Sequence, residues 1–212
     1  MPFFGKKPQY TPNTAGVIPD AANPLTTEAL EDLLIPLQTQ AGLTADYSSD
    51  WPSPCVISHS EQKCQWQPVY QLEQGSYAKA MFTRLEEALG FTVHPDLVAF
   101  YSLFWSHQVE TQLPESLAEH LNDNGLCLLL PWSEQDLEAL RQNYIGHYLQ
   151  QKKRKLAPTF FFACPLNDEK HMISLNNQTG EVVLERPGYK PSTKLADNLG
   201  LFLKDLRLRS AD

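Results

Sequence analysis

The chain has 212 residues and is acidic, with 25 Asp and Glu against 17 Lys and Arg and a formal net charge of −8 at pH 7. A hydrophobic content of 42% with 20% charged residues is ordinary for a globular protein and does not indicate a disordered one. The acidic balance disfavours nucleic acid and anionic lipid as partners, because both would repel it.

The charge is divided unevenly along the chain. Residues 20–138 contain 18 carboxylates and only three basic side chains, Lys63, Lys79 and Arg84, which is a local balance of −15. Residues 139–212 carry 12 basic and 7 acidic groups and are therefore positive. Such a chain is expected to meet a basic polypeptide through an acidic surface.

The first 24 residues contain five prolines, which predicts a flexible arm (1–24) ahead of a single domain over residues 25–212. The N-terminus lacks the apolar run of roughly 7 to 15 residues that a signal peptide requires, and no run approaches the roughly 18 apolar residues of a membrane span. The four cysteines show no C-x-x-C spacing. We therefore expect a cytoplasmic protein whose cysteines are small core residues.

Helical and strand patterns alternate through the first half of the domain. Leucines at helical spacing predict a helix over residues 25–41. Residues 52–58 and 64–70 predict the two strands of a hairpin. Two further helices are predicted over residues 76–89 and 95–105, the first because Gly90 stops it and the second because Pro95 suits a first helical position.

The clearest helix is predicted from Ser133 through the basic residues 152–155, where Ser133 and Asp136 have the spacing of a capping box. Glu134, Asp136 and Glu138 lie at its N-terminal end, and the basic residues lie at its C-terminal end. Both groups complement the helix dipole. Part of the uneven charge is therefore ordinary helix chemistry.

Short strands dominate the rest of the chain. Residues 106–124 give the least legible pattern, a strand around Val109 followed by a loop. Helices and short strands without regular βαβ alternation predict an α+β fold, in one compact domain with a mainly antiparallel central sheet flanked by helices. The other predicted elements are strands at 127–130, 159–164, 171–175 and 181–185 and a last helix from Ser192 to Arg209.

The sequence carries no recognisable catalytic motif. The sequence has no glycine-rich phosphate cradle and no G-x-S-x-G elbow. Isolated histidines and cysteines are more often structural or exposed than catalytic, so we expect no enzyme, no cofactor and no metal. The disfavoured candidates are a metal site of His107, Glu110 and His120, and thiolate–base pairs of Cys55 with His59 or Cys164 with His171.

One longer pattern goes further than composition. Residues 131–164 contain WSEQDL, then NYIGH, a basic run, LAPT and an aromatic strand, in that order. This segment resembles the Syd family of SecY-interacting proteins. The resemblance spans roughly residues 50–208, with supporting segments at 52–58, 64–69, 93–102, 174–183 and 194–206.

The resemblance implies a compact α/β domain related in fold to the SUKH superfamily, without known catalysis. It implies a peripheral protein on the cytoplasmic side of the inner membrane, which monitors or modulates assembly of SecY complexes. An electronegative concave surface would receive the basic cytoplasmic loops of SecY in the SecYEG translocon. The charge pattern agrees, because membrane proteins concentrate Lys and Arg in their cytoplasmic loops.

Five carboxylates are candidates for that acidic surface. Glu86, Glu134 and Asp136 are the stronger ones, and Glu87 and Glu110 are the weaker ones. The alternative is that they are solvated helix and strand ends. Two other functions stay open: a SUKH-type immunity protein that neutralises a toxin by covering its basic surface, and an enzyme that uses one of the histidines or cysteines.

Overall fold

A seven-stranded antiparallel sheet organises the molecule, as seen in a computed structural model that describes residues 20–71, 75–119, 121 and 124–209. The strand order is β11-β10-β9-β8-β7-β6-β12, and each neighbouring pair is antiparallel. The predicted α+β class with a mainly antiparallel central sheet is confirmed. The strands are β6 (Val109–Gln112), β7 (Gly125–Leu128), β8 (Thr159–Pro165), β9 (Met172–Asn176), β10 (Val182–Glu185), β11 (Thr193–Ala196) and β12 (Arg207–Leu208).

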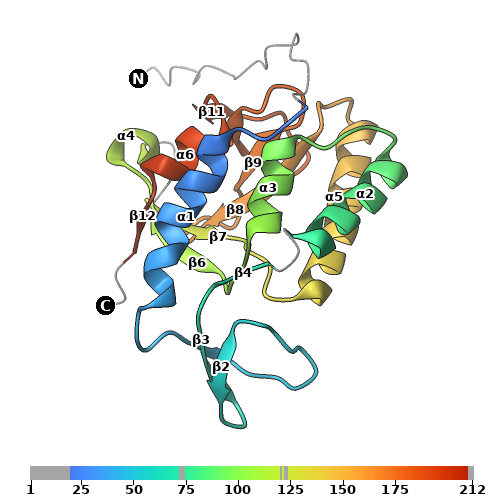
Figure 1. Ribbon diagram of the computed structural model, residues 1–212. Coiled ribbons are helices and arrows are strands. Elements are labelled where there is room, and N and C mark those ends of the chain that lie inside the picture. The colour runs from blue at the N-terminus through green and yellow to red at the C-terminus, as the bar shows by residue number, and fades with distance from the viewer. Residues whose placement is uncertain (1–19, 72–74, 120, 122–123, 210–212) are drawn as a thin grey trace.

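Helices cover the sheet in two groups (Figure 1). Helices α1, α3 and α6 pack on one another in front of the sheet, while α2 packs along α5 beside them. Phe100 of α3 and Phe202 of α6 both contact Phe162 of β8, with ring centroids 5.5 and 5.7 Å apart, so the main core lies between these helices and the sheet. The helices are α1 (Pro24–Gln38), α2 (Ser76–Leu89), α3 (Pro95–Leu103), α4 (Glu115–Ala118), α5 (Glu134–Lys153) and α6 (Leu199–Asp205).

A small sheet projects from the lower end of the molecule in Figure 1. It contains β1 (Thr44–Asp46), β3 (Lys63–Trp66) and β2 (Val56–His59), in that order. The predicted hairpin is confirmed as β2 and β3. Strand β1 was not predicted, because three residues with one buried side chain, Ala45, give no recognisable alternation.

A second short pairing joins β4 (Val69–Tyr70) to β5 (Phe104–Trp105). It shortens the helix predicted to reach Trp105, since α3 ends at Leu103 and the next two residues are extended. Both strand residues of β5 are buried, which explains why their apolar side chains continued the helical pattern. The pairing fixes Tyr70 beside the end of α3.

The last predicted helix is partly wrong. The segment after Ser192 forms β11 against β10, and α6 begins only at Leu199, where the Asn198 side chain accepts the Leu201 N–H at 2.9 Å. Sheet pairing prevails over local periodicity because Leu195 can bury its side chain from a strand as well as from a helix. In residues 106–124, where the sequence pattern was least clear, the predicted strand around Val109 is confirmed as β6. The predicted loop after it contains the short helix α4.

The start of the domain is fixed by contacts between helices. Helix α1 begins at Pro24, and its N-cap residue is Asn23. The backbone N–H of Asn23 donates to the Asp96 carboxylate of α3 at 2.6 Å. The predicted N-terminal arm lies outside the described residues up to residue 19. None of the helices in the described ranges is both long and apolar enough to cross a membrane.

Candidate partner-binding surface

The N-terminus of α5 is organised by one carboxylate. Asp136 closes the predicted capping box, since its Oδ2 accepts the backbone N–H of Ser133 at 3.0 Å and that of Trp132 at 2.9 Å. Its Oδ1 accepts the indole N–H of Trp51 at 3.2 Å. Three donors therefore engage the Asp136 carboxylate inside the molecule, which leaves it little capacity for a partner.

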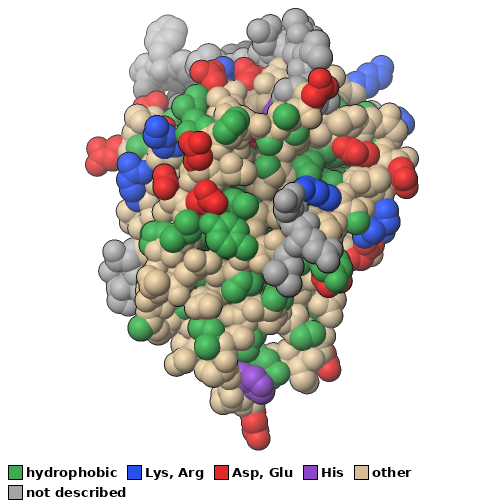
Figure 2. Space-filling model, viewed as in Figure 1, with side chains coloured by type: hydrophobic (Ala, Val, Ile, Leu, Met, Phe, Trp, Pro, Cys, Tyr) green, Lys and Arg blue, Asp and Glu red, His purple; other side chains and the backbone are tan. Residues whose placement is uncertain are grey.

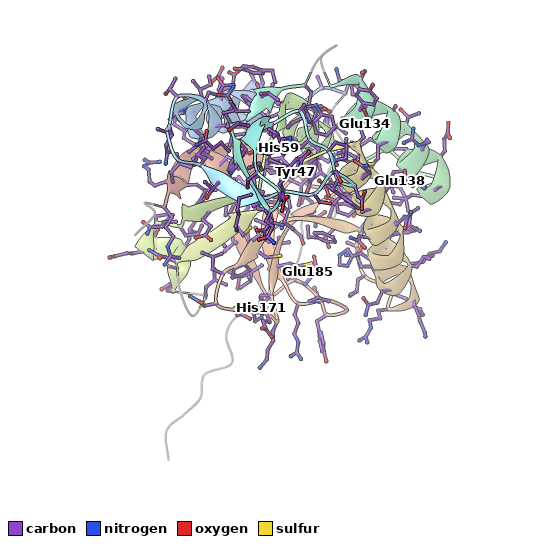
Figure 3. The ribbon with its side chains drawn as sticks, turned by 90° about the horizontal axis from the view of Figure 1, so that it is seen from below. Tyr47, His59, Glu134, Glu138, His171 and Glu185 are labelled. Atoms are coloured by element: carbon purple, nitrogen blue, oxygen red, sulfur yellow. The ribbon has the colours of Figure 1, made fainter. Side chains whose placement is uncertain are left out.

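Two other carboxylates of the same helix turn outward. Figure 3 shows Glu134 and Glu138 together on the first turns of α5, away from the end of the sheet that carries Glu185 and His171. The Glu134 carboxylate has no hydrogen bond or ion pair within the described residues. Glu134 is therefore available to an incoming cation.

Glu138 is already engaged by two arginines. Arg141 donates to it from Nε at 3.1 Å and from Nη2, and the Arg84 guanidinium of α2 lies 3.7 Å from it. The hydrogen bonds from Arg141 hold the pKa of the Glu138 carboxyl below its usual range. Glu138 therefore stays ionised at neutral pH while much of its charge is neutralised locally.

An aromatic groove lies beside Glu134. It encloses about 850 Å³, and its apolar lining includes Pro52, Pro54, Tyr70, Tyr77 and Trp105. Glu134 and Glu138 line the same groove. The groove thus places exposed tyrosine rings next to a free carboxylate, a combination that suits a ligand with apolar and cationic parts.

The remaining predicted carboxylates are dispersed. Glu86 is half-buried and accepts the Val93 N–H at 2.8 Å, so it fastens the turn between α2 and α3. Glu87 is exposed and lies one turn beyond Arg84, so it shares the side of α2 that faces Glu138. Glu110 is exposed on β6, opposite Cys127 of β7.

A second hollow lies between the helices of the front face. It encloses about 1010 Å³ and is lined by Val98 and Ala99 of α3, by Ala22 ahead of α1 and by Glu86. On the face seen in Figure 2, hydrophobic side chains are exposed in the middle of the molecule, whereas most charged side chains lie in the upper half. Tyr70 lines both this hollow and the aromatic groove, so the two are neighbours.

The candidate chemical groups do not form a reactive centre in the described part of the chain. Burial raises the pKa of Cys55 to about 12 and also raises the pKa of Cys164, so neither thiol is readily ionised as a nucleophile must be. The His107 ring packs against Trp66 and Trp132, with centroids 5.4 and 5.5 Å away, and these two tryptophans also contact each other. Across the described ranges, no three His, Cys, Asp or Glu side chains converge as metal ligands, and His120 lies outside those ranges.

The sequence does not predict the aromatic residues of the groove as a site. Tyr70 and Tyr77 flank a short segment between a strand and a helix, and Trp105 was assigned to a helix. Nothing in their spacing predicts that they meet Pro52 and Glu134 in space. Helical spacing places Tyr77 one turn before Met81, at the edge of the apolar stripe of α2, so the sequence carries no signal that its ring stays exposed.

Fold and surface together define an antiparallel α+β protein with an acidic, aromatic groove at the start of its longest helix. A family model described as "Syd protein (SUKH-2)" matches residues 34–207. The chain is 36% identical to "Protein Syd" of Pseudoalteromonas atlantica over 171 residues, which is 79% of this chain and 84% of that protein. The chain therefore belongs to the Syd family.

Other relatives agree. "Protein Syd" of Colwellia psychrerythraea is 36% identical over 169 residues, 77% of this chain and 80% of that protein. "Protein Syd" of Yersinia pseudotuberculosis is 38% identical over 156 residues, 74% of this chain and 78% of that protein. The family resemblance that the sequence predicted is confirmed.

Proposed function

We propose that this protein is a non-enzymatic partner of SecY that associates with the cytoplasmic face of the SecYEG translocon and monitors or modulates assembly of the complex. It would lie peripherally on the cytoplasmic side of the inner membrane. Family membership supports the proposal, since the chain belongs to the Syd family and the resemblance to that family implies an interaction with SecY. The observation that carries it here is the exposed carboxylate of Glu134, which lines the aromatic groove and has no partner in the part of the chain that the structure describes.

The contact would be electrostatic in its first stage. Cytoplasmic loops of membrane proteins are rich in Lys and Arg, so an acidic surface accelerates and orients their docking. Glu134 and Glu87 are the carboxylates best placed for this, because both are exposed on the paired helices α5 and α2. Asp136 would contribute mainly by holding the helix start in place.

Co-sedimentation with proteoliposomes that contain SecYEG tests the proposal. We expect SecYEG-dependent binding that weakens as NaCl rises from about 50 to about 500 mM, because screening shortens the range of the attraction. Glu134→Lys combined with Glu87→Lys should weaken it further at low salt. Glu169→Lys, an exposed carboxylate in the connection from β8 to β9, is the matched control.

Asp136 is unsuitable for this test because its substitution would disturb the fold. Equal sedimentation with empty liposomes would overturn the proposal. A pull-down that recovers a basic toxin in place of SecY would also overturn it and would favour an immunity function.

A further inference from the structure

The aromatic groove presents more apolar surface than an electrostatic contact requires. Tyr70 is 43% exposed and Tyr77 is 53% exposed, whereas Trp105, which lines the same groove, is only 6% exposed. Tyr77 and Trp105 have ring centroids 6.4 Å apart. Two exposed tyrosine rings and a buried tryptophan thus line one hollow, and large exposed rings around a hollow are typical of a binding site.

The groove is fixed before any partner arrives. The Tyr70 hydroxyl donates to Glu31 of α1 at 3.0 Å, and its ring packs on Phe104 with centroids 4.2 Å apart. On the other side, Pro52 belongs to the loop that Asp136 holds through Trp51. Rigid walls reduce the entropy that binding costs, so the shape is suited to selecting a ligand.

The carboxylates that line the groove favour a positively charged ligand. The rim carries Glu134, which has no partner among the described residues, and Glu138, which Arg141 and Arg84 already hold. Of these two carboxylates, Glu134 is therefore the one open to an added cation. An anionic or neutral ligand would leave Glu134 without a counter-ion.

We propose that the aromatic groove binds an extended basic segment in which a prolyl residue lies within a few positions of an Arg or Lys. The prolyl ring would pack on Tyr70, Tyr77 and Trp105, and the cation would pair with Glu134. Aromatic-lined grooves bind proline-containing segments well, because such segments are already extended in solution. The inference rests on the proposed function for the source of the segment, a basic loop of the membrane partner.

Binding of a synthetic probe tests the groove directly. The probe is a fluorescein-labelled decapeptide of alternating Pro and Arg, measured by fluorescence anisotropy on the full chain. We expect it to bind more tightly than a version with Gly for Pro and a version with Gln for Arg. The apolar part of the binding should persist at about 1 M NaCl, where charges are screened within about 3 Å.

Tyr77 offers a variant that should keep its fold, because its side chain is exposed. Tyr77→Ala should weaken binding of the Pro-Arg probe at least about fivefold, both at low salt and at about 1 M NaCl. Tyr77→Phe should bind the probe almost as tightly as the wild-type protein. Tyr189→Ala is the matched control, because Tyr189 is 52% exposed and lies against Arg154 and Arg186, outside the groove. Glu134→Gln should weaken binding of the Arg-containing probe and leave the Gln version unchanged.

Several results would overturn the inference. One is equal affinity for the Pro-containing and Gly-containing probes. Another is a loss of probe affinity in Tyr189→Ala as large as that in Tyr77→Ala. A third is probe binding that appears only after residues 1–19 are removed, since those residues would then fill the groove.

The proposed function fails separately. If wild-type protein and Tyr77→Ala bind SecYEG proteoliposomes equally, the groove inference fails and the function stands; if wild type binds only the peptide, the function fails.

Discussion

The Asp136 carboxylate joins the start of α5 to Trp51, which lies 85 positions earlier in the chain. The indole N–H donates to Oδ1 at 3.2 Å, while Oδ2 accepts two backbone N–H groups at the helix start. The loop that supplies Pro52 and Pro54 to the aromatic groove is thereby fastened to the helix that supplies Glu134. Asp136, predicted as a partner contact, thus connects two segments that line the groove.

Asp136 and Glu134 should therefore differ sharply in their effect on stability. Asp136→Ala removes the acceptor of three donors and should lower the free energy of unfolding by about 1 to 2 kcal/mol. Glu134→Gln removes a carboxylate that has no partner among the described residues and should change the free energy of unfolding by less than about 0.5 kcal/mol. Urea unfolding followed by circular dichroism measures both, and equal losses would contradict the assignment of Asp136 as the joint.

The helix start could be predicted from sequence because its signals are local. A capping box spans four residues, and acidic residues in the first turn reinforce it. The β8–β9–β10 meander was equally legible, since polar turns separate its apolar runs. Strand β11 was not, because Leu195 and the leucines of α6 share a spacing that also fits one continuous helix.

The groove could not be predicted by the same reasoning. Its walls come from the Pro52 loop, from β4, from the starts of α2 and α5, and from Trp105. Only packing brings these segments together, and none carries a spacing that signals the others. Charge counting predicts a contact at Glu134 but gives no indication of the tyrosines, since aromatic rings carry no charge.

His94 should make stability depend on pH. Burial lowers its pKa below the ordinary 6.5, against the weaker effect of the nearby Asp96 carboxylate. Its Nδ1 accepts the Asp96 N–H at 3.3 Å as the cap of α3, a role that protonation would abolish. The unfolded chain therefore binds this proton more readily, so the His94 contribution is complete above pH 6.5 and is lost progressively as the pH falls below it.

His94→Asn should flatten this dependence, because asparagine can cap a helix and does not titrate between pH 5 and 7. The measurement is the free energy of unfolding of both proteins across that range. The Asp96 carboxylate and the Asn177 amide, which accepts the His94 N–H at 2.8 Å, remain in both. A wild-type curve as flat as that of the variant would refute the assignment.

The Glu138–Arg141 pair should also make stability depend on pH, but in a more acidic range and because of hydrogen bonds, not burial. Hydrogen bonds from Arg141 hold the pKa of Glu138 below its ordinary 4.5, so the stabilisation is present above pH 4.5 and is lost as the pH falls through the lower folded value. Because the pair is partly exposed, its coupling should be only about 0.3 to 0.5 kcal/mol at pH 7. A double-mutant cycle of Glu138→Gln and Arg141→Met measures this, and a coupling that survives at pH 2 would contradict it.

Two glycines at the ends of α2 provide a matched test of backbone conformation and space. Gly75 and Gly90 have φ of 75° and 79°, so alanine at either position adopts a strained left-handed conformation at a cost of about 1 kcal/mol. A Cβ on Gly90 would meet no atom within 4 Å, whereas one on Gly75 would lie 2.2 Å from the backbone oxygen of Ser102. Gly90→Ala should therefore cost about 1 kcal/mol of unfolding free energy, and Gly75→Ala should cost at least about 1 kcal/mol more.

The extra cost at Gly75 has a local consequence as well. The clash would push the start of α2 away from Ser102, and with it Tyr77, two residues further on. Gly75→Ala should then weaken binding of the Pro-Arg probe even where the protein is fully folded, and Gly90→Ala should not. Anisotropy titrations at a temperature well below both unfolding midpoints separate the two effects. Equal probe affinities in the two variants would show that the groove does not depend on how closely α2 approaches α3.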